Sequence, residues 1–144
     1  MPDDAMNDDL LIRTVAAVIV DAQGRVLLVR KRGSGTFIQP GGKREPGEDA
    51  LATLARELRE ELGVRLRPES ALRLGEFEAD AVNEPGRRVR GEAFHVAVSG
   101  EPAAGAEIEA LAWIDPRPPY PVPVAPLSAL HILPAFLSMV RERG

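Results

Sequence analysis

A loop rich in glycine and proline leads directly into an amphipathic helix in this chain. The loop, Pro40 to Glu48, contains too much glycine and proline to form a helix or a central strand. From Asp49 to Leu62 the apolar residues recur with helical spacing on one face. These residues are Leu51, Leu54, Ala55, Leu58 and Leu62. Gly63 is a natural end for the helix, because glycine adopts the left-handed conformation without strain. The sequence therefore predicts a loop followed by a helix that packs one face into a core.

Three glutamates lie on the face of this helix opposite the leucines. Glu57, Glu60 and Glu61 are spaced i, i+3 and i+4, so they span an arc of roughly 100°. Carboxylates held this close repel one another and favour a bound cation. Oxygen ligands at this density suit Mg²⁺ or Mn²⁺, and Glu48 at the end of the loop can join them. The alternative is a solvated helix whose glutamates only form ion pairs with arginines.

Strand-like segments flank the loop and helix on both sides. Residues 11–20 and 25–32 are separated by a turn, which predicts a β-hairpin. We expect three further strands, near residues 72–78, 92–98 and 111–114. The last segment, 127–143, has helical spacing but contains Pro134. It predicts either a helix that begins near Pro134 or a longer, kinked helix.

The length of 144 residues fits one domain. We expect residues 1–9, which are polar and acidic, to form a flexible tail and residues 10–144 to form that domain. A net charge of −4 and the lack of a Lys/Arg-dense segment argue against a nucleic-acid polymer as partner. The longest apolar run, 15–20, is too short to cross a bilayer, and no export signal is evident. The chain has no cysteine, which excludes disulfides and agrees with a cytoplasmic location.

The segment 42–64 resembles the Nudix box, a signature of the Nudix hydrolase family. Its fixed positions in this sequence are Gly42, Glu48, Arg56, Glu57, Leu58, Glu60, Glu61, Gly63 and Val64. Every fixed position matches, and so many matches at fixed spacing make the pattern specific. The resemblance implies an α/β protein with the Nudix fold. In that fold a mixed β-sheet lies in an α/β/α sandwich, and the box forms a loop–helix–loop against it.

The resemblance also implies a metal site with a defined set of ligands. Glu60 and Glu61 are the expected metal ligands, and Glu57 is expected to be a further ligand or the general base. The carbonyl of Gly41 is expected to complete the shell, and Glu48 to assist through water. The implied cofactor is Mg²⁺, with Mn²⁺ as the other candidate.

The implied reaction is hydrolysis of the diphosphate linkage in a nucleoside diphosphate joined to another moiety. Arg56 is expected to hold a glutamate in position through a charge-assisted hydrogen bond. Family members often recruit one more acid from a late loop, as ligand or base. Glu109 is preferred for this role over Glu107, because Glu109 lies four residues before Trp113.

Four residues in or next to the loop are candidates for substrate binding. Gly42 and Lys43 are placed to touch phosphate. Phe37 is a candidate platform for a base, although an aromatic residue is more often part of a core. The amide of Gln39 is a candidate reader of a base edge.

The box by itself does not specify the substrate. The ADP-ribose type usually has a proline about fifteen residues past the box and the diadenosine-polyphosphate type a tyrosine, and this chain has neither. We therefore expect a housecleaning nucleoside triphosphate pyrophosphatase. The alternatives are an ADP-ribose or other nucleotide-sugar pyrophosphatase, and a non-catalytic nucleotide sensor. The expected partner is a small nucleotide, with neither a nucleic-acid polymer nor a membrane, and the expected assembly is a monomer or homodimer.

Overall fold

A computed structural model describes residues 10–143 of the chain. Along these residues the elements are β1 (Leu11–Val18), β2 (Val26–Lys31), β3 (Gly41–Lys43), α2 (Ala50–Leu62), β4 (Arg65–Asp80), β5 (Arg88–Ser99), β6 (Ile108–Ile114), η1 (Leu127–Ile132) and α3 (Leu133–Arg143). The tail expected at residues 1–9 lies outside the described residues, and the domain boundaries stay a prediction.

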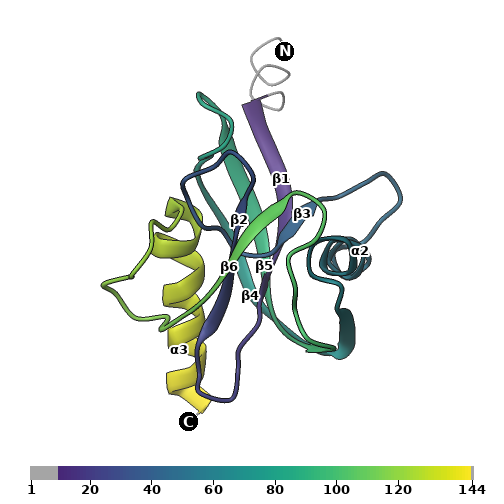
Figure 1. Cartoon of the computed structure of the whole chain (residues 1–144), viewed down its shortest axis with the longest axis vertical. Helices are drawn as coiled ribbons and strands as arrows, with labels where there is room; N and C mark the ends of the chain where they lie inside the picture. Colours follow the sequence, from purple (N-terminus) through teal and green to yellow (C-terminus); the bar gives the residue numbers. More distant parts are fainter. Residues whose placement is uncertain (1–9, 144) are drawn as a thin grey trace.

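The strands form two sheets between helices. One sheet has the order β3-β1-β5-β4, in which β1 pairs parallel with β5 while β3 and β4 pair antiparallel with their neighbours. The other sheet is the antiparallel pair β2-β6. Figure 1 shows α2 on one side of the strands and α3 on the opposite side. The expected mixed sheet in an α/β/α arrangement is confirmed.

The expected hairpin between residues 11–20 and 25–32 is correct only at its turn. Two backbone hydrogen bonds close the turn. The amide of Asp21 donates to the carbonyl of Arg25 at 2.9 Å, and the amide of Leu27 donates to the carbonyl of Ile19 at 2.9 Å. Beyond the turn the strands diverge: β1 enters the four-stranded sheet, whereas β2 pairs with β6. Local sequence predicts a turn well, but it does not specify the distant partners of each strand.

Two hydrophobic clusters lie on opposite sides of the strands. One contains the buried leucines of α2, namely Leu54, Leu58 and Leu62, packed against β1, β2 and β5. The other gathers residues of β1 and β2 with Ile132, Leu133 and Phe136 of the C-terminal helix. Each helix therefore buries its apolar face in its own cluster, which fixes α2 and its glutamates against the edge of the sheet.

Local signals explain both ends of α2, and the end at Gly63 is as predicted. Asp49 is the N-cap, and its side chain accepts from the amide of Ala52 at 2.8 Å. Gly63 ends the helix with φ of 69°, in the left-handed region. As predicted, the loop before the helix contains no central strand. Its residues 41–43 form the short strand β3, which lies at the edge of the sheet.

Other elements are longer than expected. Strands β4 and β5 begin before residues 72 and 92, and the last strand, β6, begins at Ile108 rather than at residue 111. The C-terminal helix takes the longer of its two predicted forms, since η1 is a π-helical segment that continues directly into α3. Pro134 lacks an amide hydrogen and crowds the preceding turn, which explains an irregular start to this helix.

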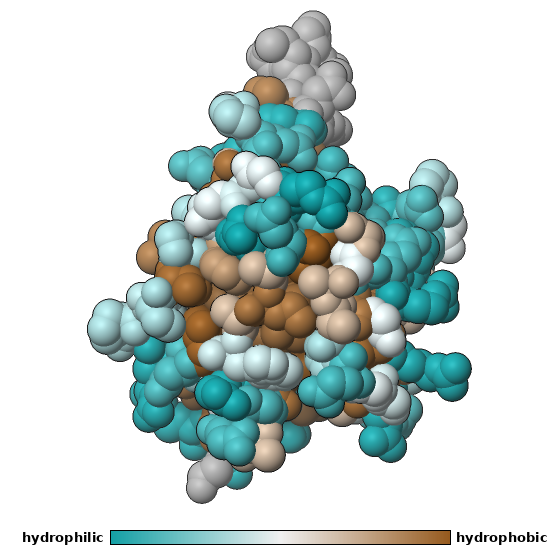
Figure 2. Space-filling model, viewed as in Figure 1, coloured by the Kyte–Doolittle hydropathy of each residue, from teal (hydrophilic) through white to brown (hydrophobic). Residues whose placement is uncertain are grey.

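The face of the molecule turned toward the viewer in Figure 2 has an apolar centre. Figure 2 shows hydrophobic residues gathered in the middle of this face, with hydrophilic residues around them. Within residues 10–143, no helix has the length and hydropathy needed to cross a membrane. The expectation of a monomer or homodimer stays a prediction.

Candidate active site

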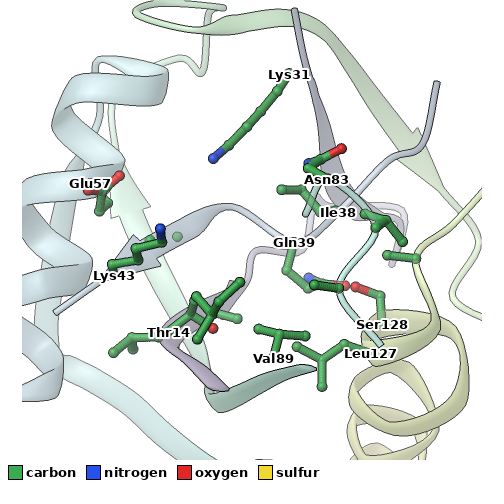
Figure 3. A pocket seen from close by; sticks show the side chains of 18 of the residues that line it. Thr14, Lys31, Ile38, Gln39, Lys43, Glu57, Asn83, Val89, Leu127 and Ser128 are labelled. Carbon is green, nitrogen blue, oxygen red and sulfur yellow. The ribbon is translucent and has the colours of Figure 1, made fainter. Parts of the chain in front are cut away.

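A pocket of about 510 Å³ lies where the edge of the larger sheet meets α2 and the start of η1. The helix contributes Glu57, Glu60 and Glu61, and the loop contributes Gly41 and Gly42. Apolar side chains from β1, β5 and η1, among them Leu127, line the rest of it together with Gln39. Figure 3 shows Glu57 at one end of this pocket, with Gln39, Leu127 and Ser128 toward the other. The pocket is therefore acidic at one end and mainly apolar at the other.

The glutamates of α2 approach the backbone of the loop closely. The amide of Gly41 donates to Oε1 of Glu61 at 3.2 Å. A Cβ on Gly42 would lie 2.3 Å from the carboxyl carbon of Glu57, so a larger residue would push that side chain out of its present orientation. The glycines of the loop thus let two carboxylates lie directly beneath the chain.

Burial changes the acidity of Glu61. Its side chain lies beneath β3 and only 6% of the residue is exposed. Desolvation raises the pKa of Glu61 to about 8, opposed by the hydrogen bond from Gly41, and the nearby Glu57 raises it further. The sequence predicted a carboxylate on the open face of the helix, and Glu61 instead lies in the wall of the site. A buried carboxyl of this kind ionises readily only when a cation lies beside it.

The stability of metal-free protein should fall as the pH rises toward 9. In the folded state Glu61 has a pKa of about 8, above its ordinary value of 4.5. The stability that the folded protein gains from this raised pKa is therefore fully present below pH 4.5 and lost as pH rises through about 8. We expect the free energy of unfolding, measured by urea titration in chelator, to fall on the order of 2–4 kcal/mol between acidic and alkaline pH. Glu61→Gln removes the titrating group, so equal losses in the variant and the parent would exclude Glu61 as the cause.

Arg56 is the centre of an ion-pair network beside the pocket. Its guanidinium donates to Glu48 at 2.7 and 2.9 Å and to Oε1 of Glu57 at 2.7 Å. It also donates to the carbonyl of Lys43 at 3.1 Å, which ties the helix to the loop. The hydrogen bonds from Arg56 hold the pKa of Glu48 down at about 2. Arg56 therefore orients Glu57 as a positioning residue.

Glu48 lies outside the pocket in spite of its place in the box. Both of its carboxylate oxygens accept from Arg56, and Oε1 also accepts from the amide of Glu45 and the hydroxyl of Thr53. These four bonds use the oxygens that were expected to act through water in the metal site. Glu48 thus closes the loop onto the helix and holds Arg56 in place.

The charges around the pocket suit a divalent cation. Six acidic residues line it, against two lysines, Lys31 and Lys43. Even with Glu61 protonated, the remaining carboxylates outnumber the lysines and would repel a polyphosphate unless cations were bound between them. Among the described residues, no three acidic or histidine side chains already converge as a metal site. Glu57, Glu60 and Glu61 are nevertheless oxygen donors on one wall, which is the donor type that Mg²⁺ and Mn²⁺ prefer.

The two candidate late acids occupy different places. Glu107 lines the pocket, whereas Glu109 accepts from Arg30 at 2.8 Å and is not among the lining residues. Arg30 pairs with Ala110 and Lys31 with Ile108, so Glu109 is the extra residue of a β-bulge. A bulge disrupts the regular alternation of side chains, which spacing from Trp113 cannot reveal. The placement does not support the preference for Glu109.

Of the four residues expected to bind substrate, three line the pocket and one does not. Gly42, Lys43 and Gln39 line the pocket. Phe37 does not: it is buried in the second hydrophobic cluster, with Arg30 over its ring. A buried ring whose surface is already covered has no face left for a base.

Several lining residues had no recognisable signal in the sequence. Figure 3 shows Lys31 extending into the pocket from the end of β2, and its charge lowers the pKa of Glu61. Ser128 and Leu127 arrive from η1, and Asn83 from the loop after β4. These residues are far apart in the chain and belong to no motif, so only the fold brings them together.

Comparison with known proteins shows similarity over most of the chain. The model of the NUDIX domain matches residues 10–131. The CTP pyrophosphohydrolase of Escherichia coli K12 is 32% identical over 134 residues, which cover 90% of this chain and 94% of that protein. The solution structure of the E. coli ORF135 protein is 32% identical, with a TM-score of 0.74, and the match covers 92% and 93% of the two chains. A nudix hydrolase family member from Chromobacterium violaceum is 26% identical, with a TM-score of 0.72 and coverage of 93% and 82%.

Proposed function

This chain belongs to the Nudix family and is a Nudix pyrophosphohydrolase, and we propose that its substrate is a nucleoside triphosphate cleaved with the help of Mg²⁺ or Mn²⁺. Water would attack phosphorus and break the diphosphate linkage, which yields a nucleoside monophosphate and pyrophosphate. Cytidine triphosphate is the first substrate to test, because the similar E. coli protein is named a CTP pyrophosphohydrolase.

The observation that carries this proposal is the polarity of the pocket. Glu57, Glu60 and Glu61 lie on one wall, and the apolar side chains of Val89 and Leu127 lie on others. A nucleotide has the matching polarity, with charged phosphates at one end and a flat apolar base at the other. The intact Glu57–Glu60–Glu61 set favours catalysis over a sensor that only binds.

The metal would be held by Glu57, Glu60 and Glu61, with the backbone of Gly41 beside them. When bound, it would neutralise phosphate charge and stabilise the charge that develops on the leaving oxygen. Lys31 and Lys43 add positive charge for the phosphates, and Figure 3 shows both lysines on the walls of the pocket. Arg56 would keep Glu57 in the orientation that the site requires.

Glu107 is our candidate for the acid that accepts the proton of the attacking water. Glu107→Gln should lower kcat by about 100-fold or more with little change in KM, because a general base acts in the transition state. Glu109→Gln is the matched control and should be nearly silent, since Glu109 forms an exposed ion pair with Arg30. The acidic limb of the pH–rate profile should be lost in the first variant. A silent Glu107→Gln would instead assign the base to Glu57.

The test of the proposed function is a nucleotide screen. Canonical and oxidised nucleoside triphosphates, sugar nucleotides and dinucleotides are each incubated with enzyme and Mg²⁺, with Mn²⁺, and with chelator. We expect metal-dependent release of pyrophosphate from at least one triphosphate. Cleavage only of sugar nucleotides would replace the proposed substrate class. Tight binding without any cleavage would show that the protein is a sensor.

A further inference from the structure

The side chain of Gln39 has one unsatisfied end inside the pocket. The residue is 6% exposed, and its Nε2 donates to the carbonyl of Ala17 at 2.8 Å. Its Oε1 is the one buried side-chain nitrogen or oxygen without a hydrogen-bond partner in the described residues. Most buried polar atoms in folded proteins have a partner, because an unpaired one is costly. A free acceptor that belongs to a pocket-lining residue therefore points to a donor on the ligand.

The orientation of this amide is fixed by the backbone. If the amide were rotated by half a turn, Oε1 would face the carbonyl oxygen of Ala17, and two acceptors would then lie 2.8 Å apart. The carbonyl of Ala17 is part of β1, so it cannot turn away without breaking the sheet. The amide atom of this pocket-lining residue that is left without a partner is consequently the acceptor, Oε1.

The surroundings of Gln39 limit the kind of ligand that can supply the donor. Figure 3 shows Gln39 and Ser128 away from the acidic end of the pocket, with Val89 and Leu127 nearby. A group that fits here has to be apolar over most of its surface and carry a hydrogen-bond donor on its edge. Because Oε1 is shielded from water, the ligand must also shift a neighbouring side chain slightly as it enters.

We propose that Gln39 determines base specificity by selecting a nucleobase with an exocyclic amino group. One amino hydrogen would donate to Oε1 of Gln39, and the hydroxyl oxygen of Ser128, which lines the same pocket, would accept the other. A carbonyl in place of the amino group would face the lone pairs of Oε1 and be repelled. Cytosine and adenine are therefore preferred over their keto counterparts, uracil and hypoxanthine. The inference rests on the proposed nucleotide substrate.

The test compares ligands that differ only in this group. Non-hydrolysable α,β-imido analogues of CTP and UTP, and of ATP and ITP, are titrated calorimetrically into the full-length protein with Mg²⁺. We expect one amino member to bind roughly 10- to 100-fold more tightly than its keto partner. The CTP and ATP arms separate a pyrimidine site from a purine site. Equal affinities within both pairs would overturn the inference.

Gln39→Met tests whether this residue is responsible. Methionine keeps the length of the side chain and removes the acceptor, so the preference for the amino ligand should shrink to within a few-fold. A full preference in a folded Gln39→Met variant would overturn the assignment. If that variant fails to fold, two other measurements decide. Ser128→Ala should show a smaller preference for the amino ligand, and an analogue of CTP without the 4-amino group should bind the parent protein more weakly than the CTP analogue does. Binding is measured without turnover, so failure of this inference is distinct from an absence of hydrolysis.

Discussion

Glu61→Gln should lower kcat by about 100-fold or more, because it removes a charge that stabilises the transition state through the metal site. The substitution preserves volume, and its oxygen can still accept from the amide of Gly41. The fold should therefore stay intact. Steady-state kinetics at saturating Mg²⁺ and nucleotide would measure the loss.

The matched control is Glu101→Gln, since Glu101 is exposed and does not line the pocket. It should retain the activity of the parent. Thermal melting in chelator adds a second readout: the Glu61 variant should be as stable as the parent or more stable above neutral pH, because no buried carboxyl has to ionise. A Glu61→Gln enzyme within a few-fold of the parent would remove Glu61 from the site.

Gly41→Ala should destabilise the protein by about 3 kcal/mol or more. Gly41 has φ of 147°, and an added Cβ would lie 2.0 Å from the carbonyl oxygen of Val15. That oxygen belongs to the neighbouring strand, so relief requires separation of β3 from β1. Such a separation would also move the amide that donates to Glu61, and activity should fall with stability.

Gly47→Ala separates conformational strain from this close contact. Gly47 also has a positive φ, 83°, but an added Cβ would meet nothing within 4 Å. Its cost should be limited to about 1–2 kcal/mol of left-handed strain. Urea unfolding of both variants makes the comparison. Equal losses would show that backbone strain alone, and not the contact with β1, makes glycine necessary at position 41.

The sequence by itself predicted the elements whose causes are local. The leucine stripe and the stop at Gly63 each act within a few residues, and they specify α2; the N-cap at Asp49, which the structure shows, is local in the same way. The spacing of the box glutamates follows from the same helix, so their meeting at one pocket was foreseeable. The class of fold also followed, because the box and the order of the flanking elements are typical of one family.

Only the tertiary structure decided the features that depend on long-range pairing. It placed β2 with β6 rather than with β1, and the bulge in that pair turns Glu109 toward Arg30 and leaves Glu107 at the pocket. It also buried Glu61 beneath β3. The free acceptor of Gln39 exists because Ala17, twenty-two residues earlier in the chain, takes its donor. A local pattern determines which residues share a helix or a strand, whereas the contacts that give each side chain its pKa, its partners and its role are made by residues far apart in the chain.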